Sequence, residues 1–514
     1  MLAQATTFTI EALQARRVTV EVDVRPGLPA FNIVGLADAS VREARERVQA
    51  AILNCGFQFP GRRVTVNLAP GDLPKVGPGL DLALACGVLA ASGQLQRETL
   101  SGCALFGELG LDGVLKPCLG TLTVAHACRQ LRIERLVLAC EGSREAMLVR
   151  GLLVAPARTL ASAVAILRGH PADDPAPAPP APARFVAPAA AEHTGRLDLS
   201  DVRGQAHAAR AVVIAAAGAH NCLLSGPPGV GKTMLAQRVP SILPPLSHSE
   251  AIEVTRIHAL AGDHPGGLAR ERPFRAPHHS TTAAGLVGGA HRHSIGEVVL
   301  AHRGVLFLDE LSEFARGALE ALRQPLEDGR VAIVRARRAA VYPARFMLIA
   351  ATNPCPCGYA GDRERCACSE PQMARHRRRL SGPLLDRIDL RVQMDGEGAL
   401  GLAGTPAPSS RQAREEVMAA RERQRMRLRE EGARVNAEMD AGMLARHARL
   451  DEHAEAMLGQ ARARWAMSAR AEHRTLRVAR TIADLAGRER IHTEDVGAAL
   501  ALRPQADTPH SRAA

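Results

Sequence analysis

One eight-residue segment constrains the fold of this chain more than any other. Residues 226–233 read GPPGVGKT, which matches the pattern G-x-x-x-x-G-K-[ST]. The apolar run Cys222–Leu224 before it predicts a short buried strand, and a helical pattern begins at Lys232. A glycine-rich turn between a strand and a helix directs backbone N–H groups into an anion cradle. The segment therefore predicts a phosphate-binding loop in an α/β core.

This loop predicts a site for ATP and Mg²⁺. Lys232 is expected to reach the β- and γ-phosphates, and the Thr233 hydroxyl to bind Mg²⁺. Lysines occur at only three places in a chain with 65 basic residues, at Lys75, Lys116 and Lys232, so the lysine at this position is informative. Phosphate chemistry here needs a compact ammonium, not a planar guanidinium. The predicted nucleotide contacts are Gly226, Pro227, Pro228, Gly229, Val230, Gly231, Lys232 and Thr233.

Two further strand patterns deliver polar residues suited to the same chemistry. The segment GVLFLDEL (304–311) predicts a buried strand that ends in Asp309 and Glu310. Asp309 is expected to hold Mg²⁺ together with Thr233, and Glu310 to orient the attacking water. The segment RFMLIAATN (345–353) predicts a third strand, whose Asn353 would contact the γ-phosphate and that water. An asparagine that merely ends a strand is the alternative.

The chain is too long for one core, since it has 514 residues. Patterns at 18–24 and 63–69 predict strands, and helices are expected at 37–56, with Ser40 as cap and Gly56 as stop, and at Leu80–Ser92. A long helical arm is expected near 411–435. The predicted domains are a mixed α/β unit at 1–168, a Pro/Ala-rich linker at 169–196, an α/β ATPase core at 197–395, a helical domain at 396–504 and a disordered tail at 505–514.

The amino-acid composition limits which binding partners can be expected. The net charge is +12, which favours a polyanion such as DNA, although a codon bias toward arginine would give the same balance. Aromatic residues make up only 3% of the chain, too few for an extended base-stacking platform, so DNA contacts should fall on phosphates. No apolar run is long enough for a membrane helix, and the N-terminus lacks the pattern of an export signal. We therefore expect a cytoplasmic protein with no membrane partner, whose eleven cysteines form no disulfide framework.

Several phrases in the predicted core resemble one family. FRAPHHS (274–280), GEVVLAHRGVLFLDELSEF, ALRQPLEDG, NPCPCGY and SGPLLDRIDL are similar to the YifB/ComM family of magnesium-chelatase-like AAA+ ATPases, and the resemblance covers essentially the whole chain. It implies an AAA+ P-loop core with a helical C-terminal lid, and the family description implies assembly into a hexameric ring. It also implies a DNA branch-migration helicase that acts in natural transformation.

The resemblance assigns further residues. Arg387 in LLDRIDL matches an arginine finger that acts on the neighbouring subunit, although a salt bridge to Asp386 or Asp389 is the alternative. Arg470 looks like the second sensor, and Arg474 is its rival. A predicted hairpin at 329–346 would point toward the ring pore. It carries four arginines that we propose contact DNA phosphates, at Arg330, Arg335, Arg337 and Arg338. A solvated basic face of the hairpin is the alternative.

The N-terminal unit resembles the proteolytic domain of Lon, an α+β domain of ribosomal-protein-S5-like fold. The matching phrases are KVGPGLDLALACGVLAASG (75–93) and GELGLDGVLKPCLG (107–120). A Lon-type protease needs a serine nucleophile and a lysine that activates it. The corresponding positions here read Gly79 and Leu122 or a neighbour. We therefore expect a proteolytically inactive domain that serves assembly or DNA engagement.

Four cysteines lie within the fourteen residues of CPCGYAGDRERCAC, at Cys355, Cys357, Cys366 and Cys368. Four thiolates at this spacing suit a tetrahedral Zn²⁺ site, and unligated turns in a reducing cytosol are the alternative. Two adjacent histidines, His278 and His279, lack a third metal-ligand partner and favour a structural or pore-loop role.

Two other functions remain open at this level. A magnesium-chelatase-type ATPase subunit that acts on a porphyrin would carry the same core motifs, but the basic charge and the N-terminal unit speak against it. An ATP-dependent protein remodeller or protease is the second alternative, and the missing serine and lysine disfavour proteolysis.

Overall fold

The computed structural model describes residues 2–170, 197–262, 267–289, 295–335, 338–360, 362, 364–380, 382–394 and 406–503. They fall into two compact units, one comprising Met1–Arg184 with Ala251–Arg270 and the other Phe185–Glu250 with Glu271–Ala514. The predicted linker beyond residue 170 and the predicted C-terminal tail lie outside the described residues.

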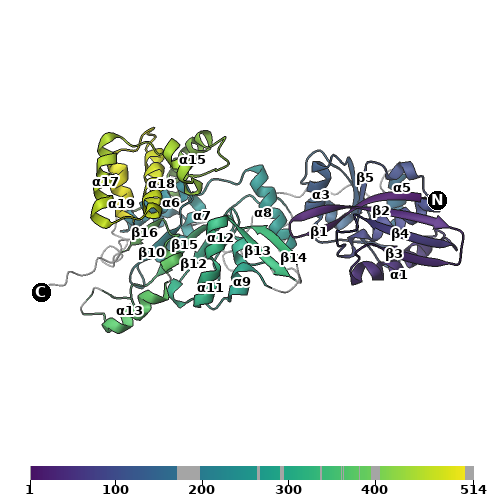
Figure 1. Cartoon of the computed structure of the whole chain (residues 1–514), viewed down its shortest axis with the longest axis horizontal. Coiled ribbons are helices and arrows are strands. Elements are labelled where there is room, and N and C mark those ends of the chain that lie inside the picture. The colour runs from purple at the N-terminus through teal and green to yellow at the C-terminus, as the bar shows by residue number, and fades with distance from the viewer. Residues whose placement is uncertain are drawn as a thin grey trace. The chain divides into compact units, whose positions relative to one another are not determined.

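The first unit is built on a seven-stranded mixed sheet (Figure 1). The strand order is β3-β4-β2-β1-β5-β8-β9; β2 runs antiparallel to both β1 and β4, and the remaining neighbours are parallel. The strands are β1 (Leu2–Glu11), β2 (Gln14–Arg25), β3 (Ala30–Val34), β4 (Arg63–Ala69), β5 (Cys103–Phe106), β8 (Arg135–Ala139) and β9 (Leu153–Ala157), and a separate short pair is β6 (Glu108–Leu109) with β7 (Leu115–Lys116).

Both faces of this sheet are buried because successive side chains point to opposite faces. In β5, Cys103 and Leu105 join one apolar cluster, whereas Ala104 and Phe106 join the other. The first cluster includes helices α1 (Ala39–Asn54), α2 (Asp81–Ala91) and α5 (Leu160–Leu167), and the second includes α3 (Thr121–Gln130) and α4 (Cys140–Ala146). This α+β arrangement is compatible with the predicted S5-like fold.

The strands and helices predicted for this unit are present. The patterns at 18–24 and 63–69 lie in β2 and β4, and the predicted helices correspond to α1 and α2. The predicted cap of α1 is wrong: the side chain of Asp38, not Ser40, accepts the Val41 N–H at 2.9 Å. A carboxylate at the N-cap also interacts favourably with the helix dipole.

One helix that follows the phosphate loop in the sequence packs in the first unit. Helix α8 (His248–Leu260) belongs to this unit from Ala251 onward. The Arg256 guanidinium donates to the Leu13 carbonyl and lies 3.4 Å from the Thr123 hydroxyl. This position of α8 was not predicted from the sequence.

The second unit contains a five-stranded parallel sheet in the order β11-β12-β15-β10-β16 (Figure 1). The strands are β10 (Cys222–Ser225), β11 (Phe274–Arg275), β12 (Val305–Leu308), β15 (Met347–Thr352) and β16 (Leu390–Gln393). All residues of β12 and β15 are buried, as expected for a parallel sheet covered by helices on both faces.

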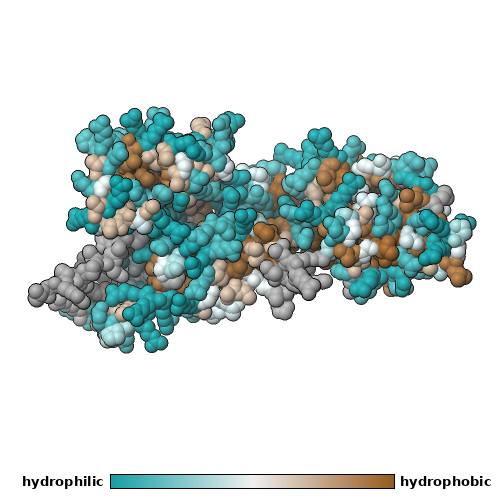
Figure 2. All heavy atoms as spheres, in the orientation of Figure 1, coloured by the Kyte–Doolittle hydropathy of each residue, from teal (hydrophilic) through white to brown (hydrophobic). Residues whose placement is uncertain are grey.

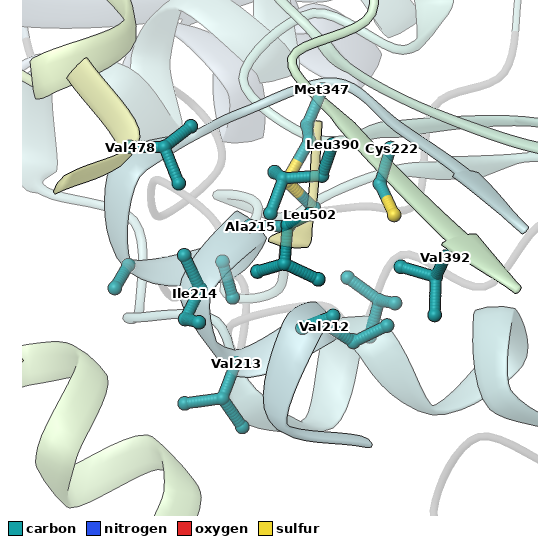
Figure 3. Close-up of a cluster of buried hydrophobic side chains, with 14 of the residues drawn as sticks. Val212, Val213, Ile214, Ala215, Cys222, Met347, Leu390, Val392, Val478 and Leu502 are labelled. Atoms are coloured by element: carbon teal, nitrogen blue, oxygen red, sulfur yellow. The ribbon is translucent and has the colours of Figure 1, made fainter. Parts of the chain in front are cut away.

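The C-terminal helices share one hydrophobic core with this sheet. Figure 3 shows Val212 and Ile214 near Leu390, Val478 and Leu502. The second unit contains the start of α8 and, beside it, the helices α6 (Ala206–Gly218), α7 (Lys232–Ile242), α9 (Ala283–Val287), α10 (Glu297–Leu300), α11 (Arg316–Ala321), α12 (Arg323–Asp328), α13 (Glu370–Arg379), α14 (Gly382–Leu385), α15 (Ser410–Arg427), α16 (Ala441–His447), α17 (Glu452–Trp465), α18 (Ala469–Leu485) and α19 (Thr493–Ala501). The helical arm predicted near 411–435 is α15, which ends at Arg427.

The predicted hairpin is present as β13 (Arg330–Arg335) and β14 (Arg338–Pro343), with Arg335 opposite Arg338. Hydrophilic residues cover much of the visible face of each unit, and apolar residues form smaller groups among these hydrophilic residues (Figure 2). Among the described helices, none combines the length and the apolar character that crossing a membrane requires.

Candidate functional site: a phosphate cradle at three strand ends

Three neighbouring strands bring the predicted site together. Strands β12, β15 and β10 are adjacent and parallel, so their carboxyl ends meet at one edge of the sheet (Figure 1). The loop 226–233 follows β10, Asp309 and Glu310 follow β12, and Asn353 follows β15. Open parallel sheets bind their ligands at this edge.

The backbone of the loop has the shape of an anion cradle. Gly229 and Gly231 have φ angles of 82° and 90°, in the left-handed region that favours glycine. A Cβ added at either position would meet nothing within 4 Å, so the space above the loop is open to a ligand. Helix α7 begins at Lys232 without a side-chain cap, which leaves its N-terminal N–H groups for a phosphate.

Lys232 is held at the centre of this site. Its side chain is buried, and its ammonium donates to the carbonyl oxygens of Gly226 at 2.6 Å and Pro227 at 2.8 Å, and to Asn353 Oδ1 at 3.0 Å. Burial lowers the pKa of Lys232, and the carboxylates of Asp309 and Glu310 oppose that shift. A desolvated ammonium in this position interacts strongly with a phosphate.

Two oxygen ligands suited to Mg²⁺ lie beside the cradle. The Thr233 hydroxyl donates to Asp309 Oδ2 at 2.6 Å, and Asp309 Oδ1 accepts the backbone N–H of Glu310 at 2.9 Å. Hydroxyl and carboxylate oxygens are the protein ligands that Mg²⁺ prefers beside a nucleotide phosphate. These residues therefore fit the predicted Mg²⁺ site.

Glu310 occupies a conformation that is uncommon for its residue type. Its φ and ψ are both 49°, in the left-handed region, and its side chain is more than half exposed. Strained backbone of this kind concentrates at functional sites. The conformation places the carboxylate at the edge of the sheet with Asp309.

A histidine that sequence reasoning left without a catalytic role contacts this carboxylate. His279 Nδ1 lies 3.4 Å from Glu310 Oε2, and the His279 ring packs on His278 with centroids 4.0 Å apart. Strand β11 pairs in parallel with β12, so the segment that follows β11 leaves the sheet at the same edge as Glu310. This strand pairing, which could not be read from the sequence, brings His279 to the site.

The comparisons with known proteins agree along the chain. Residues 198–399 match the model "Magnesium chelatase, subunit ChlI", residues 20–142 match "Subunit ChlI of Mg-chelatase", and residues 407–503 match the C-terminal model of that subunit. The chain is 42% identical over 497 residues to competence protein ComM of Haemophilus influenzae, covering 96% of this chain and 95% of the relative. It is 41% identical over 479 residues to YifB of Escherichia coli, covering 92% and 91%.

The chain belongs to the YifB/ComM family of magnesium-chelatase-like AAA+ proteins. A protein of Mycobacterium tuberculosis is also similar, with 44% identity over 505 residues and 98% of each chain covered. The resemblance stated from the sequence motifs is thereby confirmed.

The two arginines that the YifB/ComM resemblance singles out lie together, at a second place in the ATPase unit. Arg387 and Arg470 both pair with Glu327, the latter at 3.1 Å, and the Arg387 guanidinium also donates to the Pro383 carbonyl. Hydrogen bonding to Arg387 is the main cause that lowers the pKa of Glu327. Both arginines line a cavity of about 770 Å³. Their contacts do not include the phosphate loop within the described residues.

Arg474, the rival of Arg470, is mostly buried. Its guanidinium donates to the Ile388 carbonyl at 3.2 Å and lies 3.7 Å from Asp386. These contacts fix the segment that carries Arg387. Asp389, the other carboxylate considered for Arg387, pairs instead with His220 at 3.2 Å.

The remaining predicted residues lie on the hairpin and in the N-terminal unit. Arg330 is exposed at the start of β13, Arg335 and Arg338 flank the turn of the hairpin, and Arg337 lies outside the described residues. In the N-terminal unit, Gly79 is buried, and a Cβ added there would overlap the Phe106 ring. Leu122 is buried in α3. Neither position offers the polar side chain that a serine–lysine protease needs.

Proposed function

We propose that this YifB/ComM-family chain is an ATP-hydrolysing ring motor that acts on DNA, as a branch-migration helicase in natural transformation or recombination. The observation that carries the ATPase part is the convergence of Lys232, Thr233, Asp309, Glu310 and Asn353 at one sheet edge. A relative of 42% identity is named a competence protein, which supports the assignment to transformation. A cytoplasmic location goes with this role.

Each side chain has a distinct task in this proposal. Lys232 neutralises phosphate charge, and Thr233 with Asp309 would hold Mg²⁺, which supplies electrostatic stabilisation of the transferred phosphoryl group. Glu310 orients the attacking water and accepts its proton, since its carboxylate is exposed at the strand end. Asn353, fixed by its bond to Lys232, positions the same water.

The positions of Arg387 and Arg470 support the proposal of a ring. Their shared partner is Glu327, and both guanidinium groups face a cavity rather than their own phosphate loop. An arginine finger supplied by a neighbour stabilises charge in the transition state. We therefore propose that Arg387 completes the site of an adjacent subunit in a hexamer and that Arg470 senses the nucleotide there.

DNA is the proposed substrate because of charge. The net charge of +12 and the arginine-bearing hairpin β13–β14 suit contacts to phosphates. The N-terminal unit, which lacks the serine and the lysine, would serve assembly or DNA engagement rather than proteolysis.

The deciding experiment measures ATP turnover with no DNA, single strand, linear duplex and a four-way junction. Junction-specific stimulation that is lost in Lys232→Ala supports the proposal. Turnover that is indifferent to every DNA would leave an ATPase without a DNA substrate.

The magnesium-chelatase family models favour one second candidate, a metal-insertion ATPase subunit. Stimulation by a porphyrin-loaded partner protein, with none by DNA, would select it. A protein remodeller would instead respond to unfolded protein.

A further inference from the structure

Four cysteine side chains converge beside the candidate ATP site. Cys355, Cys357, Cys366 and Cys368 lie in the segment between β15 and α13. Their four sulfur atoms all lie within 4.8 Å of one another. Cys355 is fully buried, and the other three are half-buried.

The distances between the sulfur atoms fit one tetrahedral ion. The Sγ atoms of Cys355 and Cys357 are 3.3 Å apart, those of Cys357 and Cys366 are 3.7 Å apart, and those of Cys355 and Cys366 are 3.9 Å apart. Zinc–thiolate bonds of about 2.3 Å place the corners of a tetrahedron about 3.8 Å apart. A disulfide would join only two of the four, and a multi-iron cluster would hold the sulfurs farther apart.

We propose that the four thiolates bind one Zn²⁺ ion and that this ion holds the segment 354–369 as a support for the ATP site. The second half of this inference rests on the proposed ATPase function; the zinc site itself does not. Four thiolates with no carboxylate or water position select a structural zinc ion over Mg²⁺ or Ca²⁺.

Among the described residues of this segment, the contacts that could order it are mostly local. Its sequence, PCPCGYAGDRERCACS, contains few apolar residues, and the hydrogen bonds that cross it are local, such as Gly358 N–H to the Cys355 carbonyl at 2.9 Å and Cys366 N–H to the Asp362 carbonyl at 3.0 Å. A short segment without a core gains its stability from a metal or a crosslink. A bound ion would therefore fix the shape of this segment.

The segment contacts the phosphate loop at Gly358. This glycine has a φ of 88°, and a Cβ added to it would overlap the Pro228 ring of the cradle. The segment and the loop therefore touch through backbone and proline ring, with no space for a side chain. A shift of the segment would move the cradle.

The segment is also tied to the polar residues of the site at both of its ends. Asn353, which accepts from Lys232, precedes Cys355 by two positions, and its carbonyl lies 3.0 Å from His376 Nε2 in α13. At the end of α13, Arg379 pairs with Glu313 at 3.1 Å, three residues after Glu310. The segment is therefore connected at its start to Asn353 and, through α13, to the residues that follow Glu310.

The first test measures metal content. The full chain, purified without chelator from zinc-supplemented cells, should contain one zinc per chain by plasma mass spectrometry. Cys366→Ser should lose it, whereas Cys55→Ser, which changes a half-buried cysteine of the other unit, should keep it. Absence of zinc, iron in its place, or a disulfide between two of the four cysteines would overturn the site. This result does not depend on any ATPase activity.

The second test asks whether the shape of the segment affects ATP turnover when its zinc is retained. Gly358→Ala should keep its zinc but lose tenfold or more in ATP turnover, because the added methyl displaces Pro228. Gly93→Ala is the matched control, since Gly93 also has a left-handed φ of 80° but a Cβ there meets nothing within 4 Å. Undiminished turnover in zinc-loaded Gly358→Ala would overturn the coupling and leave the metal site standing. Absence of turnover in the wild type would instead count against the proposed function.

Discussion

At the residue scale, the clearest prediction concerns Glu310. Its left-handed backbone and its exposed carboxylate place a proton acceptor beside Asp309 without a direct contact to Lys232 in the described hydrogen bonds. We expect Glu310→Gln to bind ATP normally but to hydrolyse it about 10²- to 10⁴-fold more slowly, since general base catalysis is worth that much. Single-turnover hydrolysis and binding of a fluorescent nucleotide measure the two effects. Turnover within tenfold of the wild type would remove Glu310 from the role of base.

His279 provides a second prediction at this scale. Because its ring lies 3.4 Å from the Glu310 carboxylate, we propose that His279 positions this carboxylate. We expect His279→Gln to lower kcat about tenfold and to leave KM for ATP within about twofold, the pattern of an interaction that matters in the transition state. His453→Gln, which changes an exposed histidine of α17, is the control. A changed KM with an unchanged kcat would place His279 in nucleotide binding instead.

At the scale of elements, the sequence predicts what depends on local patterns. The buried run of four apolar residues before Asp309 is strand β12, and helix α7 begins at Lys232 because the glycine-rich loop ends there. Contacts between distant segments were not predictable. Neither the approach of His279 to Glu310 nor that of Gly358 to Pro228 is encoded in spacing, since both depend on strand order and loop path. The cap of α1 was missed because Asp38 and Ser40 are both good capping residues.

The hairpin β13–β14 supplies a prediction at the same scale. Reversing the charge of Arg335 and Arg337 should weaken DNA binding and reduce the slope of log K against log salt by about two, since each phosphate contact contributes about 0.9. The measurement is a salt titration of binding to a labelled four-way junction. Reversing Arg429, which follows α15, and Arg464 in α17, two exposed arginines, makes the same change in net charge and should alter the slope far less. Equal effects of the two pairs would mean that net charge, not the hairpin, sets the affinity.

At the scale of the whole molecule, the separation between the phosphate loop and Arg387 predicts that one chain is incomplete. Arg387 is held by Glu327, and Lys232 is held by Gly226, Pro227 and Asn353. If the finger acts on a neighbour, Lys232→Ala and Arg387→Ala variants should each be inactive alone yet restore activity when mixed. A Lys232→Ala subunit still offers Arg387, and an Arg387→Ala subunit still offers an intact phosphate loop.

The size of the rescue follows from the arrangement. In a ring assembled at random from equal amounts, about one interface in four joins an intact loop to an intact finger, so turnover should reach about a quarter of the wild-type value. Mixing either variant with the Lys232→Ala/Arg387→Ala double variant creates no such interface and should restore nothing. Native mass spectrometry of the mixtures checks that the variants co-assemble. Mixed rings that form but stay inactive would show that Arg387 serves its own subunit, and the cavity around Glu327 would then be a structural ion-pair site rather than half of a shared active site.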